Sequence, residues 1–191
     1  MPRIPIVQRF LPCFVLVVPI LCSGCFDNIS SEFPPELEPL EEENRAALPS
    51  GEDFPEELSL SGKETDDYYS VHARGYVQAP IDKVYEAAST PLATVDRREV
   101  DKWTIEGTDE GNQYCVDLPQ QIKKCHVIQN QVDDIITVEF DVAWRFGGEI
   151  RDEDEALERA HGRWQKVWGS EVLELLEGSI VLLRVSDEVT E

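Results

Sequence analysis

Two segments of the chain alternate regularly between apolar and polar positions. Over residues 69–78, apolar or small side chains occupy one set of alternate positions, and mostly polar ones occupy the other. Over residues 135–146, apolar side chains stand at every even-numbered position from Ile136 onward. A period of two predicts a half-buried β-strand in both places. At about 3.3 Å per residue the second strand would be about 40 Å long, so we expect it to curve.

Between these strands the period changes to that of a helix. Apolar residues recur at spacings of three and four, at Ile81, Val84, Tyr85 and Ala88. This pattern predicts a short amphipathic helix that begins after Pro80 and ends before Pro91, followed by a second helical turn over residues 92–100. Residues 152–161 also resemble a surface helix, because acids gather at their start and Arg159 lies near their end, which suits the helix dipole.

Shorter apolar runs bounded by turn residues predict the remaining strands. They cover residues 103–107, 113–118, 122–131, 163–176 and 180–185. We expect hairpins about residues 119–121 and 177–179, and Gly147 and Gly148 are expected to end the long strand. Residues 189–191 resemble the start of one more strand. The predicted fold is α+β: a curved antiparallel sheet with two short helices after its first strand.

The first 24 residues have the composition of an export signal. Arg3 and Arg9 precede an apolar run over residues 10–21. This run is too short to span a bilayer, which needs about 20 residues, and it has the length of the apolar part of a secretory signal peptide. Pro12 and Pro19 also make it a poor membrane helix.

The end of this segment carries a lipidation pattern. Ser23 and Gly24 precede Cys25, which resembles the lipobox of bacterial lipoproteins, although Cys22 stands where that family usually has Leu. The resemblance implies that cleavage leaves a lipid-modified Cys25 as the new N-terminus. Phe26, in place of the Asp that retains such proteins in the inner membrane, implies an outer-membrane lipoprotein that faces the periplasm. The alternative is an ordinary cleaved signal peptide.

Residues 25–66 have the composition of an acidic tether. They carry thirteen acids and two bases, with five prolines and the run Glu41, Glu42 and Glu43. Such a segment buries too little apolar surface to offset the entropy of ordering, so we expect a disordered spacer. An acidic bait for a basic partner or for cations is the functional alternative. The folded domain is then expected over residues 67–191.

The overall charge limits the possible partners. The 191 residues carry 39 acids and 17 Lys and Arg, for a formal net charge of −22. Binding to nucleic acid needs clustered basic side chains, so this class of partner is excluded. An anionic membrane would also repel the chain unless acyl chains held it there.

The residues from 71 to about 189 carry a resemblance to a known superfamily. A strand leads into the sequence VQAPIDKVYEAASTP over residues 77–91, then a short helix and a run of antiparallel strands. This order is similar to the START-like, polyketide cyclase/SRPBCC or helix-grip superfamily. The resemblance implies a curved sheet that grips a C-terminal helix and holds lipids or other apolar molecules. The final strand and that helix are missing here, which implies an incomplete chain, a partner that covers the sheet, or an open groove.

Few residues indicate covalent or metal chemistry. Cys115 and Cys125 lie symmetrically about Gln120 in the expected hairpin, which predicts a disulfide, with two free thiols as the alternative. His72, His126 and His161 lack metal-ligand spacing, so we expect no metal and no cofactor. Phosphate-loop and nucleophile-elbow motifs are absent from the sequence, and no catalytic residue is identified.

Large aromatic side chains are the remaining candidates. An apolar pocket could be lined by Tyr85, Phe140, Trp144, Phe146, Trp164 and Trp168. Ordinary core packing is the alternative for each of them. Three functions therefore remain possible. The first is non-catalytic binding of a lipid or other apolar molecule, and the second is a protein-interaction module that uses the open sheet face. The third is a cyclase or aromatase, for which the sequence offers no catalytic residue.

Overall fold

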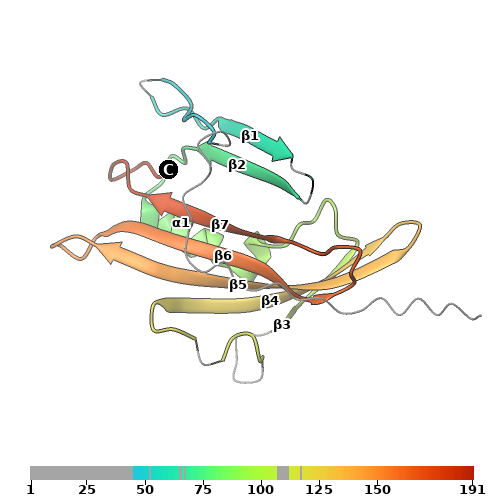
Figure 1. Cartoon of the computed structure of the whole chain (residues 1–191). Coiled ribbons are helices and arrows are strands. Elements are labelled where there is room, and N and C mark those ends of the chain that lie inside the picture. Colours follow the sequence, from blue (N-terminus) through green and yellow to red (C-terminus); the bar gives the residue numbers. More distant parts are fainter. Residues whose placement is uncertain (1–44, 52, 65, 67, 107–111, 117) are drawn as a thin grey trace, which may run out of the picture.

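The structure is a computed structural model that describes residues 45–191, except residues 52, 65, 67, 107–111 and 117 (Figure 1). The expected signal peptide, Cys25 and the first part of the expected tether lie outside the described residues. The elements are β1 (Leu58–Glu64), β2 (Tyr69–Gly75), α1 (Ile81–Ala88), η2 (Pro91–Ala93), β3 (Lys102–Glu106), β4 (Ile122–Asp133), β5 (Thr137–Arg151), β6 (Leu157–Gly169) and β7 (Glu177–Leu183). The α+β class with antiparallel strands is confirmed.

The strands form two antiparallel sheets. β1 and β2 pair with each other, and the other five strands follow in chain order from β3 to β7. Figure 1 shows the long strands β4, β5 and β6 stacked side by side, with the β1–β2 ribbon beyond β7. The sheet of five strands has two faces. Trp144 and Ile180 lie on what we call the helix face, and Asp141 and Val127 lie on the outer face.

The helix α1 covers one end of the helix face. Its sequence buries Ile81 and Tyr85, which are four residues apart on one side of the helix. These two side chains pack in one core cluster with residues of β5, β6 and β7, namely Phe146, Leu157, Ala160 and Leu182. The predicted helix is confirmed. The second helix is reduced to the 3-10 turn η2, which begins at Pro91.

The predicted helix over residues 152–161 is wrong. Residues 152–156 form a turn, in which Asp152 Oδ1 accepts hydrogen bonds of 2.9 Å from the backbone amides of Asp154 and Ala156, and β6 follows. The pairing of β5 with β6 shifts register between Gly147 and Ile150 and again at Arg151. Such bulges interrupt the period of two that would have indicated a strand. Without that period, the acids at the start and the late Arg resembled a helix.

Three boundaries also differ from the sequence expectation. β5 continues through Gly147 to Arg151 instead of ending at the two glycines. Gly147 serves there to let the backbone of Gln121 approach, since a Cβ would lie 1.9 Å from the Gln121 carbonyl oxygen. Residues 113–118 form turns and bends in their described part and do not form a strand. The expected turn at residues 177–179 lies inside β7.

The folded part of the chain begins before residue 67. β1 lies inside the range assigned to the tether, where Leu58 and Leu60 alternate with serines, and it pairs along its whole length with β2. The backbone amide of Ala46, a buried residue, donates a hydrogen bond of 2.9 Å to His72 Nδ1. The predicted strand at residues 69–78 is confirmed over its first seven residues.

Candidate functional site

Three aromatic rings lie in a row on the helix face. The ring centroids of Trp144 and Trp164 are 4.8 Å apart, and those of Trp144 and Phe146 are 6.1 Å apart, both in stacked arrangements. We call Trp144, Phe146 and Trp164 the aromatic platform. It crosses from β5 to β6, because Trp144 and Trp164 are direct partners in the ladder. Stacking of this kind is worth about 0.5–1.5 kcal/mol beyond the burial of area.

Two glycines allow these rings to lie close against the sheet. A Cβ at Gly162 would lie 2.5 Å from Phe146 Cε1, and one at Gly178 would lie 2.2 Å from Trp164 Cζ2. Each glycine pairs across the ladder with the aromatic residue that covers it. Any side chain at these positions would lift the ring away from the sheet. Opposed aromatic and glycine residues on neighbouring strands were a signal that the sequence analysis missed.

The platform is closed at one end and open at the other. Phe146 is 1% exposed, and it packs with Tyr85 beneath α1. Trp144, Trp164 and Ile180 are only partly buried. Four of the six pocket candidates therefore do come together, as a surface rather than as an enclosed cavity.

The other two candidates lie elsewhere. Phe140 shares the helix face, but it is buried and pairs with Gly169 at the far end of the contact between β5 and β6. Trp168 pairs with Asp141 across a register shift, so it lies on the outer face, opposite to Trp164. Sequence periodicity could not place Trp168, because the bulge inserts Val167 as an extra residue.

A neutral histidine adjoins the platform. The ring of His126, from β4, is 5.9 Å from that of Phe146 in a stacked arrangement, and its Nε2 is 2.9 Å from Thr94 Oγ1. Burial lowers the pKa of His126 to about 4. The imidazole is thus uncharged at neutral pH, and it keeps this end of the helix face compatible with an apolar neighbour.

A buried ammonium group lies next to Trp164 along the same face. Lys166 is fully buried, and its Nζ donates to the carbonyl oxygens of Ser170 at 2.9 Å and Leu173 at 2.5 Å. Burial lowers the pKa of Lys166. These two hydrogen bonds hold the loop that follows β6 against the helix face.

The outer face contains an acidic cleft of about 600 Å³. Its lining includes Glu106, Glu139, Asp141 and the misplaced pocket candidate Trp168. Burial, and then the negative charges of Glu106 and Glu139, raise the pKa of Asp141 to about 6. Glu106 is held by side-chain amides, at 3.0 Å from Asn112 Nδ2 and 2.9 Å from Gln129 Nε2. Such a cleft disfavours anions, and among the described residues no cluster of His, Cys, Asp or Glu is arranged to hold a metal ion.

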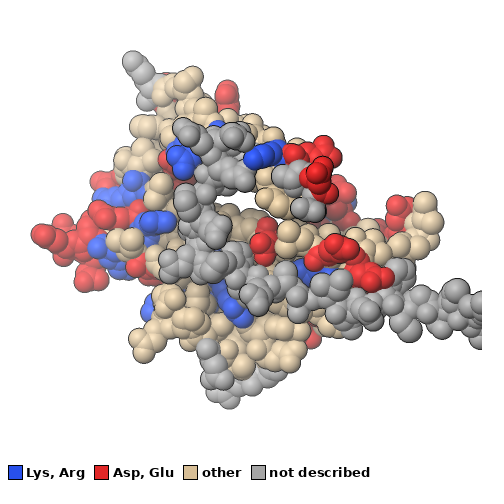
Figure 2. All heavy atoms as spheres, viewed as in Figure 1, with Lys and Arg blue, Asp and Glu red and all other residues tan. Residues whose placement is uncertain are grey.

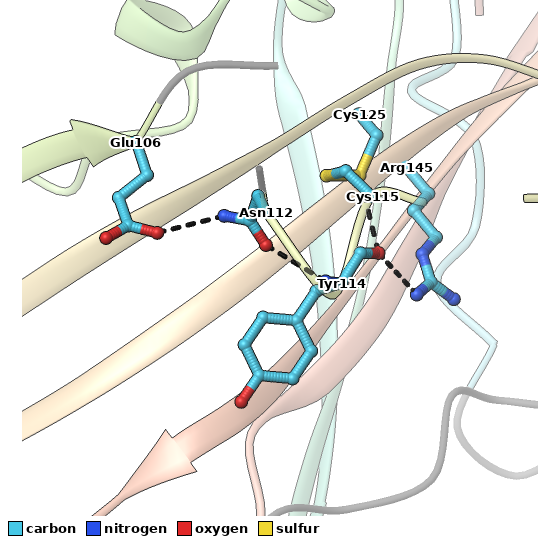
Figure 3. The surroundings of a disulfide bond; sticks show 6 residues. All are labelled: Glu106, Asn112, Tyr114, Cys115, Cys125 and Arg145. Atoms are coloured by element: carbon cyan, nitrogen blue, oxygen red, sulfur yellow. Dashed lines mark hydrogen bonds between the residues drawn. A yellow bond between two sulfur atoms is a disulfide. The ribbon is translucent and has the colours of Figure 1, made fainter. Parts of the chain in front are cut away.

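The disulfide between Cys115 and Cys125 is present, with the Cα atoms 5.6 Å apart. Figure 3 shows that it fastens the segment around Tyr114 over the outer face, rather than linking two strands. Arg145 Nη2 donates to the Tyr114 carbonyl at 2.7 Å, and Cys125 Sγ lies 3.7 Å from the same oxygen. A disulfide sulfur carries no hydrogen, so this last approach is a packing contact.

A serine and a lysine lie close together near a second cleft, of about 510 Å³, beside the disulfide. Lys124 Nζ donates to Ser89 Oγ at 2.6 Å, and Ser89 Oγ donates to the Tyr85 carbonyl at 2.6 Å. Ser89 is 3% exposed and ends α1. The pair therefore caps the helix, with a cation at its C-terminal end, and offers no accessible nucleophile.

None of the helices in the described part of the chain is long and apolar enough to cross a membrane. Comparison with protein-family models, curated proteins and solved structures found no match to this chain.

Proposed function

We propose that the protein is an envelope lipoprotein whose domain binds a lipid or other apolar small molecule, without catalysis, on the aromatic platform. The observation that supports this most is the half-open stack of Trp144 and Trp164 beside the apolar residue Ile180. Each 100 Å² of apolar surface that a ligand removes from water there is worth about 2.5 kcal/mol. The neutral His126 and the buried Phe146 adjoin this stack at its closed end.

We assign the domain to the helix-grip, START-like type on the order of its elements. A strand leads through Pro80 into α1, then a helical turn and a run of antiparallel strands follow. The resemblance implies that an apolar ligand lies between the sheet and its covering helices, and the platform lies on the face that α1 covers. This assignment rests on the motif at residues 77–91 and on that order.

Membrane attachment is proposed through acyl chains on Cys25, with the domain in the periplasm. The disulfide supports this placement, because disulfides persist in exported compartments. In membrane fractionation, the wild-type protein should partition with detergent, and Cys25→Ser should partition with the aqueous phase. If Cys25→Ser stays in the detergent phase, the lipoprotein proposal is wrong.

Ligand binding can be tested with two matched tryptophan variants. Trp164→Ala removes one half of the platform stack, while Trp168→Ala removes an exposed tryptophan four residues away on the opposite face. We expect Trp164→Ala to weaken binding of the fluorescent fatty acid cis-parinaric acid about tenfold, and Trp168→Ala to leave it unchanged. Equal affinities for all three proteins, or no binding to the wild type, would contradict the proposal.

A protein-interaction module is the second candidate. The β1–β2 ribbon favours it, because its apolar residues point to solvent, with Leu58 68% exposed and Tyr69 67% exposed. Leu60 and Val71 lie on the same side of the ribbon, since they occupy positions of the same parity in the ladder. A surface of this kind marks contact sites in soluble proteins.

A further inference from the structure

One face of the β1–β2 ribbon is apolar, and it is the more exposed of the two. Its large side chains have the same parity in the ladder, and we call them the apolar ribbon face: Leu58, Leu60, Tyr69 and Val71. Leu60 is 64% exposed and Val71 is 57% exposed. The opposite face is half-buried and entirely polar: Ser59, Ser61, Lys63, Ser70, His72 and Arg74. The usual order of a sheet, with apolar residues inside and polar ones outside, is therefore reversed.

The apolar ribbon face lies on the same side of the molecule as the helix face. Leu183 and Glu191 exchange backbone hydrogen bonds of 2.8 Å and 2.9 Å, so their side chains point to the same side. For Leu183 this is the outer side, because its neighbour Leu182 packs in the core cluster beneath α1. Arg74 Nε donates to Glu191 Oε1 at 2.9 Å, so Arg74 also points to the outer side. Val71 has the opposite parity in β2 and points to the side of the helix face.

This arrangement relates the ribbon to the aromatic platform. Figure 1 shows the ribbon beyond β7, the strand that carries Ile180 next to the platform. Trp144 and Trp164 are half-buried on the same side. An extended surface that contacts the apolar ribbon face would therefore also lie in front of the platform.

The proposed acyl anchor is joined to the domain at this ribbon. The backbone amide of Ala46 donates to His72 Nδ1 at 2.9 Å, which fixes the chain to β2. Nineteen residues, 26–44, separate Cys25 from Arg45. A flexible segment of this length spans about 25 Å, and a fully extended one spans about 65 Å. A membrane that holds acyl chains on Cys25 is therefore within reach of the ribbon.

Charge indicates how the ribbon could contact that membrane. The apolar ribbon face has one acidic neighbour in the ladder, Glu64, and no basic one. Figure 2 shows acidic side chains gathered where β5 turns into β6, away from the ribbon. Attraction to anionic lipid would need basic residues, so contact must come from insertion of apolar side chains. Tyr69 suits this role, because tyrosine is enriched at the level of lipid headgroups.

We propose that the apolar ribbon face inserts into the surface of a phospholipid bilayer and turns the helix face towards it. The bilayer is the one that holds the acyl chains on Cys25, so this inference rests on the proposed lipid anchor. Insertion of this kind buries an apolar face about 5–10 Å into the boundary between headgroups and acyl chains. An apolar ligand would then pass between the bilayer and the platform without crossing bulk water.

The test uses the full lipidated chain in vesicles of phosphatidylcholine and phosphatidylethanolamine, with the fluorophore NBD on one introduced cysteine. Leu60→Cys places the label on the apolar ribbon face, and Ser61→Cys places it one residue away on the opposite face. Leu183→Cys places it on the outer face of β7. The native Cys115 and Cys125 are joined in the disulfide and do not react with the label.

We expect doxyl-labelled phosphatidylcholine to quench the label at residue 60 at least about threefold more strongly than at residue 61 or 183. Iodide in the water should show the reverse order, and added salt should leave the lipid quenching unchanged, because the contact is apolar. Equal lipid quenching at residues 60 and 61 would overturn the inference. Shielding of residue 60 from iodide without lipid quenching would also overturn it, and would assign the ribbon to a protein surface.

Flotation of the same samples separates this inference from the lipid anchor on which it rests. A chain that floats with the vesicles, but gives either of the two contradicting results, retains its anchor and lacks the ribbon contact. A wild-type chain that does not float with the vesicles would overturn the lipid anchor, and the ribbon contact with it.

Discussion

Opening the disulfide should lower the stability of the domain by an amount that follows from its loop. Cys115 and Cys125 are 10 residues apart, and the chain-entropy model assigns about 2.5–3 kcal/mol at 25 °C to a loop of that length. The native segment keeps other attachments when the bond opens. Arg145 still bonds the Tyr114 carbonyl at 2.7 Å, and the Tyr114 hydroxyl donates to the Val167 carbonyl at 3.3 Å. The loss should therefore come mainly from the freer unfolded chain.

The assay is urea unfolding of a soluble form that begins after Cys25, followed by fluorescence, with and without a thiol reductant. With a typical urea slope of about 1–3 kcal/mol per molar, we expect the midpoint to fall by about 1–3 M on reduction. The double variant Cys115→Ala, Cys125→Ala should show the same loss, and reductant should not affect it. A loss under about 1 kcal/mol would refute the reasoning, as would an equal response of the variant to reductant.

Three other changes should raise or lower the stability of the domain in a stated direction. Burial lowers the pKa of His126 to about 4 in the fold, against 6.5 for the free side chain, so the unfolded chain takes up this proton first as the pH falls. The free energy of unfolding should therefore fall by about 2–3 kcal/mol from pH 7 to pH 4. In urea titrations, His126→Gln should lose much of that pH dependence. The pKa of Asp141 is raised to about 6 because burial and the neighbouring carboxylates make its ionised form unfavourable in the fold. Asp141→Asn should therefore stabilise the domain by about 1 kcal/mol at pH 7, after discount for solvent screening. Below pH 4, where Asp141 is protonated, the substitution should not stabilise it. Gly178→Val should lower the melting temperature, at a cost of about 1–3 kcal/mol, because its Cβ would lie 2.2 Å from Trp164 Cζ2.

The sequence predicted those elements whose period is uninterrupted. The alternation at residues 69–78 and 135–146 and the helical spacing from Ile81 to Ala88 all lie on real elements. The prediction for the start of β6 was wrong because its period is interrupted. Bulges near Ile150 shift the ladder, so Leu157 and Ala160, both fully buried, fall three residues apart, as on a helix.

Tertiary contacts decided the rest. β1 contains few large apolar residues in an acidic segment, and its pairing with β2 gives it order that composition does not predict. The disulfide was predicted from a hairpin that does not form, yet the turn at residues 112–116 brings Cys115 to Cys125. Among the pocket candidates, Trp164 and Trp168 have the same local pattern, and only the register shift beside Val167 separates their faces.

Heavy-atom quenching of tryptophan fluorescence can show whether an apolar ligand contacts the helix face. The chain has four tryptophans, of which Trp144 and Trp164 form the platform and Trp168 lies on the outer face. Trp103 pairs with Asn130, which pairs with Phe140, so it shares the helix face and is replaced by phenylalanine in both variants. One variant retains Trp144 and Trp164, the other retains Trp168, and both would be titrated with 9,10-dibromostearate. We expect saturable quenching in the variant that keeps Trp144 and Trp164 and none in the other. Equal quenching in both, or quenching confined to Trp168, would show that the ligand does not bind on the platform.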